Sequence, residues 1–274
     1  MNLVEVKPKK RSKLRIACGK LFYTNKRRII WYLHRNHYSR MFLDQNLPLI
    51  AFTHQTPLLR KLQNVDMWYQ TNKIINLKLA IKELDGLVIK PGETFSYWRS
   101  IGKPTKRKGY VDGMVLHCGK FMPGVGGGLC QLSNLLYWMT LHTTLTVTER
   151  YRHSFDVFPD SNRTQPFGSG ATCAYNYLDL QIENKTSNTY QLRLKVTDSY
   201  LVGEWRCHHP QLETYQVYEG SHEMKMAFWG DYVRHNTIYR KVYNGQMEEI
   251  DDQFVAENYA IMMYQPYLEN QEAN

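Results

Sequence analysis

Cys130 is the residue of this 274-residue chain whose setting points most directly to chemistry. It follows a glycine-rich run over 124–128, and the apolar residues after it (Leu132, Leu136 and Met139) recur at helical spacing. Free N–H groups and the helix dipole favour an anion in the first turn of a helix, so a thiol there becomes more acidic and nucleophilic. The alternative is a glycine-rich packing turn followed by a buried, inert cysteine.

Two further residues would complete a thiol active site. Residues 145–157 alternate between apolar and polar types, so a strand there places His153 on its apolar face. The next predicted strand, 174–183, carries Asn176 on its buried side. Papain-like and transglutaminase-like thiol enzymes use this order of helix cysteine, strand histidine and orienting Asn or Asp. The imidazole takes the thiol proton and the third group holds the ring. Asp160, in a turn-rich loop, is an alternative third group.

The same segment predicts a ligand site. Backbone N–H groups of the glycine run and of the first helical turn, together with the Gln131 amide, would stabilise an oxyanion or hold a ligand. We therefore predict that the ligand-binding residues surround Cys130. They are Gly126, Gly127, Gly128, Gln131, Ser133 and Arg150.

The chain also contains soft metal ligands that do not form a recognisable site. They occur at His117-Cys118 and at Cys207-His208-His209, without a C-x-x-C pair or any paired spacing. The glycine run lacks the G-x-x-x-x-G-K-[ST] order of a phosphate-binding loop. We expect neither a metal nor another cofactor.

Positive charge is concentrated at the N-terminus. Residues 1–40 hold twelve Lys or Arg and one acidic residue, whereas the rest of the chain is nearly neutral. Such an arm indicates an anionic surface as partner, and a basic amphipathic helix over 14–40 would lie on an anionic membrane. The alternative is a solvated helix packed on the main domain. The body shows no basic stripe, so we expect no nucleic acid.

The charged N-terminus and the number of cysteines predict a cytoplasmic location. The first residues are charged rather than apolar, which is unlike a signal peptide, and no stretch approaches 18 apolar residues. Five cysteines leave at least one unpaired, and we expect all five to be reduced thiols. We predict a cytoplasmic protein with peripheral contact at the inner membrane face.

The expected fold class is α+β, with N-terminal helices before a mainly antiparallel sheet domain and a central helix bearing Cys130, in a transglutaminase-like or papain-like arrangement. Strands at 174–183 and 189–197 predict a hairpin. The segments are a basic helical arm (1–45), a helical preface with a helix at 71–84 (46–86), a core domain (87–247) and an acidic C-terminal segment with one last strand at 259–264 (248–274).

Several short runs carry a resemblance to a known family. They are P-G-E-T-F-S at 91–96, G-Y at 109–110, G-G-G-L-C-Q-L-S-N-L-L-Y at 126–137, E-R at 149–150 and H-S at 153–154. With these blocks the chain resembles the VanW family, the vancomycin B-type resistance accessory family, most closely over 87–200. The resemblance implies a setting in the peptidoglycan metabolism and glycopeptide resistance of Gram-positive bacteria, with a peptidoglycan precursor or muropeptide as partner.

Three hypotheses follow for the function. The first is a cysteine-dependent amidase, peptidase or transpeptidase that acts on a precursor peptide through Cys130 and His153. The second is a non-catalytic module that binds a cell-wall precursor at the membrane. The third is a partner protein of other resistance enzymes, in which the glycine–cysteine motif has only a structural role.

Overall fold

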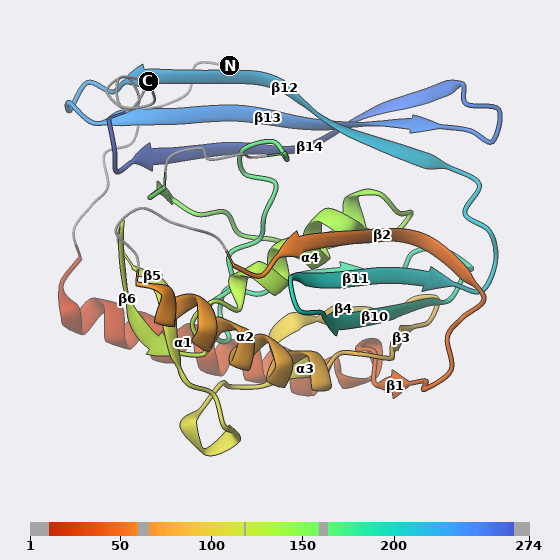
Figure 1. Ribbon diagram of the computed structural model, residues 1–274, viewed down its shortest axis with the longest axis horizontal. Coiled ribbons are helices and arrows are strands. Elements are labelled where there is room, and N and C mark those ends of the chain that lie inside the picture. The colour runs from red at the N-terminus through yellow and green to blue at the C-terminus, as the bar shows by residue number, and fades with distance from the viewer. Residues whose placement is uncertain (1–10, 60–65, 118, 159–163, 266–274) are drawn as a thin grey trace.

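A computed structural model describes residues 11–59, 66–117, 119–158 and 164–265 of the chain. The fold is α+β, as predicted. In the described ranges the paired strands are antiparallel, except that β8 (Phe155–Asp156) runs parallel to β14 (Glu249–Met262). Figure 1 shows the long C-terminal strands as one layer, with the helix that bears Cys130 in the middle of the molecule.

The central helix α4 (Cys130–Leu141) is the element that the sequence predicted best. Leu132, Leu136 and Met139 are fully buried, and the backbone N–H of His142 closes the last turn on the Met139 and Thr140 carbonyls. The helix packs on strands β11 and β2 of a five-stranded sheet. In order across that sheet, the strands are β1 (Met41–Phe42), β3 (Leu87–Ile89), β10 (Tyr190–Val196), β11 (Tyr200–Cys207) and β2 (Leu49–Pro57).

A three-stranded sheet shows that a predicted hairpin and a predicted continuous strand are wrong. Its order is β4 (Thr94–Ser96), β9 (Gln181–Glu183) and β7 (Thr146–Glu149). The predicted hairpin of 174–183 with 189–197 is wrong, because β9 pairs with β4 and β7 whereas β10 pairs with β3 and β11. The predicted continuous strand over 145–157 is also wrong, since 150–154 are irregular between β7 and β8. Alternation of residue types indicates which face a side chain takes, but it does not identify the partner strand or the strand ends.

The C-terminal strands form a second large sheet. Strands β12 (Thr214–Met226), β13 (Tyr232–Tyr243) and β14 are antiparallel neighbours, and β8 adds to the far side of β14. The last strand is therefore longer than the predicted 259–264, because β13 supplies a partner for the acidic residues from Glu249 onward. Residues 266–274 of the predicted acidic segment lie outside the described residues.

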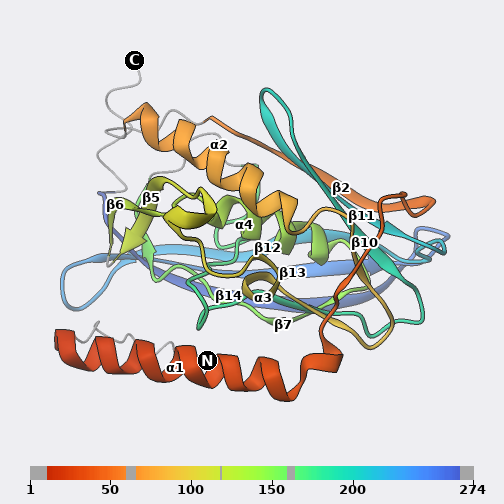
Figure 2. The same ribbon diagram turned by 90° about the horizontal axis from the view of Figure 1, so that it is seen from below.

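Two long helices lie on opposite sides of the molecule (Figure 2). Helix α2 (Met67–Lys82) confirms the predicted helix and buries Leu77, Ala80 and Ile81. It contacts a two-stranded sheet formed by β5 (Asp112–His117) and β6 (Lys120–Val125). Helix α1 (Lys13–Leu33) buries only Trp31 among its residues. The connections include η1 (Arg35–His37), α3 (Tyr97–Ile101) and η2 (Lys106–Lys108). In the described ranges, no helix is both long and apolar enough to cross a membrane.

Candidate functional site

The glycine run before α4 is an interlocking contact between two stretches of backbone. A Cβ atom at Gly127 would lie 2.1 Å from the carbonyl carbon of Gly113, so this position admits no side chain. The Asn76 side chain on α2 donates to the Gly127 carbonyl at 2.9 Å. The amides of Gly126, Gly127 and Gly128 donate within the protein at 3.0 Å each, to the carbonyls of Val111, Gly124 and Met114 respectively. These three predicted ligand donors are thus already engaged.

Cys130 is the first residue of α4, as predicted, but its surroundings do not activate the thiol. The backbone N–H of Cys173 donates to the Cys130 sulfur, and the Tyr97 hydroxyl binds the carbonyl of the preceding residue, Leu129, at 2.9 Å. Burial raises the pKa of the Cys130 thiol and outweighs the hydrogen bonds that the sulfur accepts from the backbone of Cys173 and of Cys130 itself, which lower it. The pKa of the neighbouring Cys173 thiol is raised well above its ordinary value for the same reason. Both groups are therefore protonated thiols at neutral pH.

The structure does not join the three predicted catalytic residues by hydrogen bonds. His153 lies in the irregular segment between β7 and β8, where burial, and then the charge of Arg150, lower the pKa of its imidazole to about 4. Asn176 is fully buried and donates to the Thr24 carbonyl of α1 at 3.3 Å. Within the described ranges, none of the hydrogen bonds of Cys130 involves either residue. Asp160 lies outside the described residues.

The other predicted ligand residues fasten α4 to its neighbours. The Gln131 amide donates to the hydroxyl of Thr56 and the carbonyl of Pro57, both at 2.9 Å. The Ser133 hydroxyl donates to the Ala171 carbonyl at 2.7 Å. Arg150 lies over the ring of Tyr137, with its guanidinium carbon 4.9 Å from the ring centroid, and donates to the carbonyls of Gly168 and Gly170 and to the side chain of Asn258.

A pair of carboxyl groups beside α1, with Asp179 fully buried and Glu149 partly buried, is the group that sequence reasoning missed. Asp179 is fully buried and accepts hydrogen bonds from the Ser96 hydroxyl at 2.5 Å and from the Trp98 amide at 2.9 Å. Its own amide donates to Glu149, which forms an ion pair with Arg27 of α1. This arrangement brings two carboxyl groups, a hydroxyl and a guanidinium together from four separate parts of the chain.

The carboxyl of Asp179 titrates in an unusual range. Burial raises its pKa to about 7, and the charge of Glu149 adds to that shift. The hydrogen bonds from Ser96 and Trp98 and the charge of Arg27 act in the opposite direction but are weaker. A carboxyl with a pKa near neutrality is suited to proton transfer. Two of its partners were visible in the sequence, since Ser96 ends the P-G-E-T-F-S run and Glu149 begins the E-R pair.

Comparison with known proteins relates these motifs to one family. A family model described as "VanW like protein" matches residues 72–206. The chain is 36% identical over 240 residues to "Vancomycin B-type resistance protein VanW" of Enterococcus faecalis, covering 86% of this chain and 87% of that protein. The chain belongs to the VanW family.

A second relative of this VanW-family protein is the uncharacterized protein YoaR of Bacillus subtilis. The two are 32% identical over 120 residues, which is 44% of this chain and 38% of that protein. No solved structure matched. The segment that matches the family model contains Cys130, Glu149 and Asp179, whereas Arg27 and the rest of α1 precede it.

The raised pKa of Cys130, a partly buried residue, predicts that its thiol is alkylated slowly. At pH 7 we expect iodoacetamide to modify Cys130 much more slowly than the exposed Cys18, which serves as an internal control, because the Cys130 thiol stays protonated. His153→Ala should leave the Cys130 rate unchanged. The measurement is the modified fraction of each cysteine by peptide mass spectrometry over time. Fast alkylation of Cys130 that slows in His153→Ala would contradict this prediction.

Proposed function

We propose that this protein is a non-catalytic accessory protein of glycopeptide resistance that binds a peptidoglycan precursor. The observation that carries the proposal is the state of Cys130, whose pKa is raised by burial and whose sulfur accepts from the Cys173 amide rather than from an imidazole. The setting is supported by the printed name of its Enterococcus faecalis relative, a vancomycin resistance protein. The signature residues Gln131, Ser133 and Arg150 bind other parts of the protein, as expected of a scaffold.

A cysteine-dependent amidase, peptidase or transpeptidase is the competing function. It needs a Cys130 thiolate, a base to accept the thiol proton and free donors for an oxyanion. The position of Cys130 at the start of α4 favours it. The raised pKa of the thiol and the lowered pKa of His153 disfavour the ion pair that such enzymes use, because each group is then most stable in its neutral form.

Binding and turnover of one soluble muropeptide separate the two functions. Affinity is measured by isothermal titration calorimetry, and cleavage or transfer is followed by mass spectrometry of the peptide. We expect saturable binding, an unchanged peptide mass, and a Kd for Cys130→Ser within about twofold of the wild type. A product that forms with the wild type and disappears with Cys130→Ser would establish the enzyme instead. Absence of binding would refute the proposed ligand.

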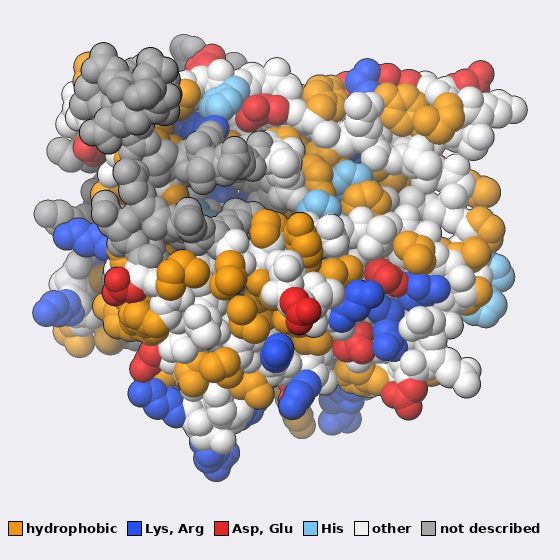
Figure 3. All heavy atoms as spheres, viewed as in Figure 1, with side chains coloured by type: hydrophobic (Ala, Val, Ile, Leu, Met, Phe, Trp, Pro, Cys, Tyr) orange, Lys and Arg blue, Asp and Glu red, His pale blue; other side chains and the backbone are white. Residues whose placement is uncertain are grey.

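We further propose that α1 holds the protein on an anionic membrane surface. Exposed apolar residues recur along one side of α1, away from the docked Trp31, and basic residues flank them. The apolar residues are Leu14, Leu21, Phe22, Ile29 and Leu33, and the basic residues are Arg15, Lys26 and Arg28. Figure 3 shows Lys and Arg side chains, interspersed with acidic and apolar ones, on the lower half of the molecule as viewed in Figure 1.

Sedimentation with vesicles tests this placement. Phe22→Glu, at a side chain that is 62% exposed on α1, should lower the fraction bound to phosphatidylglycerol vesicles severalfold by removing apolar contact and adding a like charge. Phe254→Glu is the matched control, because this residue is 59% exposed on β14. Equal sedimentation of the wild type and the two variants would contradict the role of α1.

A further inference from the structure

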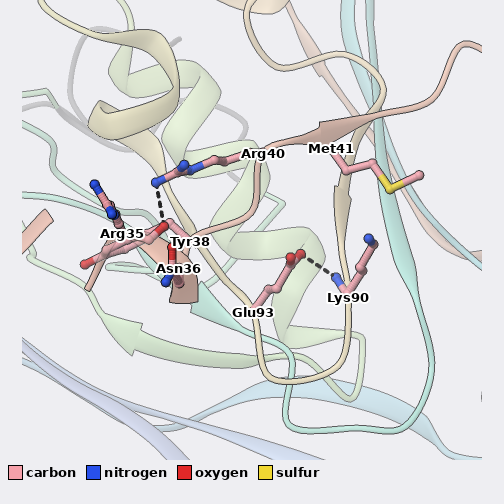
Figure 4. Close-up of a pocket in the computed structure, with 7 residues that line it drawn as sticks. All are labelled: Arg35, Asn36, Tyr38, Arg40, Met41, Lys90 and Glu93. Carbon is pink, nitrogen blue, oxygen red and sulfur yellow. Dashed lines mark hydrogen bonds between the residues drawn. The ribbon is translucent and has the colours of Figure 1, made fainter. Parts of the chain in front are cut away.

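A pocket rich in arginine lies at the C-terminal end of α1. It has a volume of about 320 Å³ and is lined by Arg28, Trp31, Tyr32, Arg35, Arg40 and Arg99. These residues come from α1, from the chain that follows it and from α3. A neighbouring hollow of about 400 Å³ shares Arg35 and Arg40 and is shown in Figure 4, where Lys90 and Glu93 form its other side. We call the first of these hollows the arginine pocket.

The arginine pocket brings together four positive charges without a carboxylate in its lining. In the part of the chain that the structure describes, none of the four guanidinium groups forms a salt bridge. They do make other contacts: Arg40 donates to the Arg35 carbonyl at 2.6 Å, and the guanidinium carbon of Arg35 lies 5.8 Å from the ring centroid of Tyr32. The guanidinium of Arg99 lies 4.8 Å from the ring centroid of Tyr38. Burial and the nearby charge of Arg40 lower the pKa of Arg99, as expected where like charges gather.

An independent observation in the same lining is the indole N–H of Trp31. The Trp31 side chain is 9% exposed, and its ring nitrogen is buried with no hydrogen-bond acceptor among the described residues. A buried donor without an acceptor costs free energy, so such groups are rare unless a ligand or water satisfies them. An oxygen-rich anion in the pocket would offset the repulsion between the arginines.

We propose that the arginine pocket binds a phosphate or diphosphate group, either free or carried by a lipid headgroup. Guanidinium groups present paired donors that match phosphate oxygens, and the four charges suit an anion with more than one negative charge. The alternative explanation is that the arginines only complement the dipole at the C-terminus of α1. Arg40 and Arg99 lie outside α1, however, and this explanation provides no acceptor for the Trp31 indole N–H. The pocket shares no residue with the Cys130 surroundings, but it shares Arg28 with the side of α1 proposed to face a membrane, so the pyrophosphate titration is the test that does not depend on that placement.

Titration of the full chain with inorganic pyrophosphate at constant ionic strength tests the pocket. We expect one saturable site by calorimetry and a Kd at least about tenfold weaker in Arg99→Gln. Arg28→Gln should also weaken binding severalfold, and this exposed residue makes no hydrogen bond in the described structure that its loss would break. Arg107→Gln in η2 is the control and should stay within about twofold of the wild type.

A vesicle experiment distinguishes the two sources of phosphate. If Arg99→Gln lowers sedimentation with phosphatidylglycerol vesicles and pyrophosphate competes with them, a lipid headgroup fills the pocket. If only pyrophosphate binding depends on Arg99, the pocket takes a free phosphate group. Either outcome supports the proposal. The proposal is overturned if pyrophosphate does not bind, or if Arg28→Gln, Arg99→Gln and Arg107→Gln weaken its binding equally.

Discussion

Arg27→Met is expected to lower the free energy of unfolding by about 3 kcal/mol, because it leaves a partly buried carboxylate without its cation. The guanidinium of Arg27 is 11% exposed and pairs with Glu149, whose carboxylate also accepts from the Gln181 amide at 2.9 Å and from the amide of Asp179. Loss of the positive charge would place two carboxyl groups next to each other without compensation. Urea denaturation followed by circular dichroism measures the change.

Three further variants, Lys26→Met, Glu149→Gln and a double variant, show whether the ion pair causes that loss. Lys26→Met changes the adjacent exposed residue of α1 and should alter stability by less than about 0.5 kcal/mol. The double variant Arg27→Met with Glu149→Gln should recover part of the loss, because no unpaired charge then remains beside Asp179. If Arg27→Met is as stable as Lys26→Met, the ion pair contributes little to stability. The same follows if the double variant loses as much unfolding free energy as Arg27→Met and Glu149→Gln lose together when measured separately.

Asp179→Asn is expected to remove part of the pH dependence of stability. The pKa of this carboxyl is raised from 3.8 to about 7, so between these values the folded protein holds a proton that the unfolded chain releases. The stability of the wild type therefore falls as pH rises through this window, by up to about 4 kcal/mol from this group. Asn cannot titrate, so the stability difference in favour of the variant should grow from about pH 4 to pH 7.

The difference between variant and wild type is the proper measurement, because His153 acts with the opposite sign. Its pKa is lowered from 6.5 to about 4, so its contribution is present above pH 6.5 and is lost as pH falls to about 4. Subtracting the wild-type curve removes this effect. Asp198→Asn, in an exposed turn, is the matched control. A constant difference for Asp179→Asn between pH 4 and pH 8 would mean that Asp179 is already ionised in the folded protein.

The sequence was most informative where structure depends on neighbouring residues. The helical spacing of Leu132, Leu136 and Met139 predicted α4 and its buried face, and Cys130 begins that helix as expected. In a regular strand over 174–183 with Asn176 on its buried side, Asp179 would lie on the opposite face. The strand starts only at Gln181, and alternation therefore did not apply to Asp179.

The carboxyl pair could not be predicted because distant segments create it. Ser96 is 83 positions from Asp179, and Arg27 is 122 positions from Glu149. Single-sequence patterns indicate burial and periodicity, but they do not show which segments meet. The predicted thiol site had the same weakness. Its residue order resembled that of thiol enzymes, whereas the hydrogen bonds of Asn176 lead to α1 and the sulfur of Cys130 accepts from the amide of Cys173.

Strand β12 also affects how copies of this protein behave toward one another. It forms one edge of the C-terminal sheet, which leaves a row of backbone donors and acceptors open to pairing with another chain. Its pairing with β13 is interrupted by a register shift between Glu219 and Ser221, and charged Glu223 and Lys225 follow along the strand. Irregular pairing and charge both discourage edge-to-edge association, so we expect this long open strand to resist pairing with the same strand of a second copy.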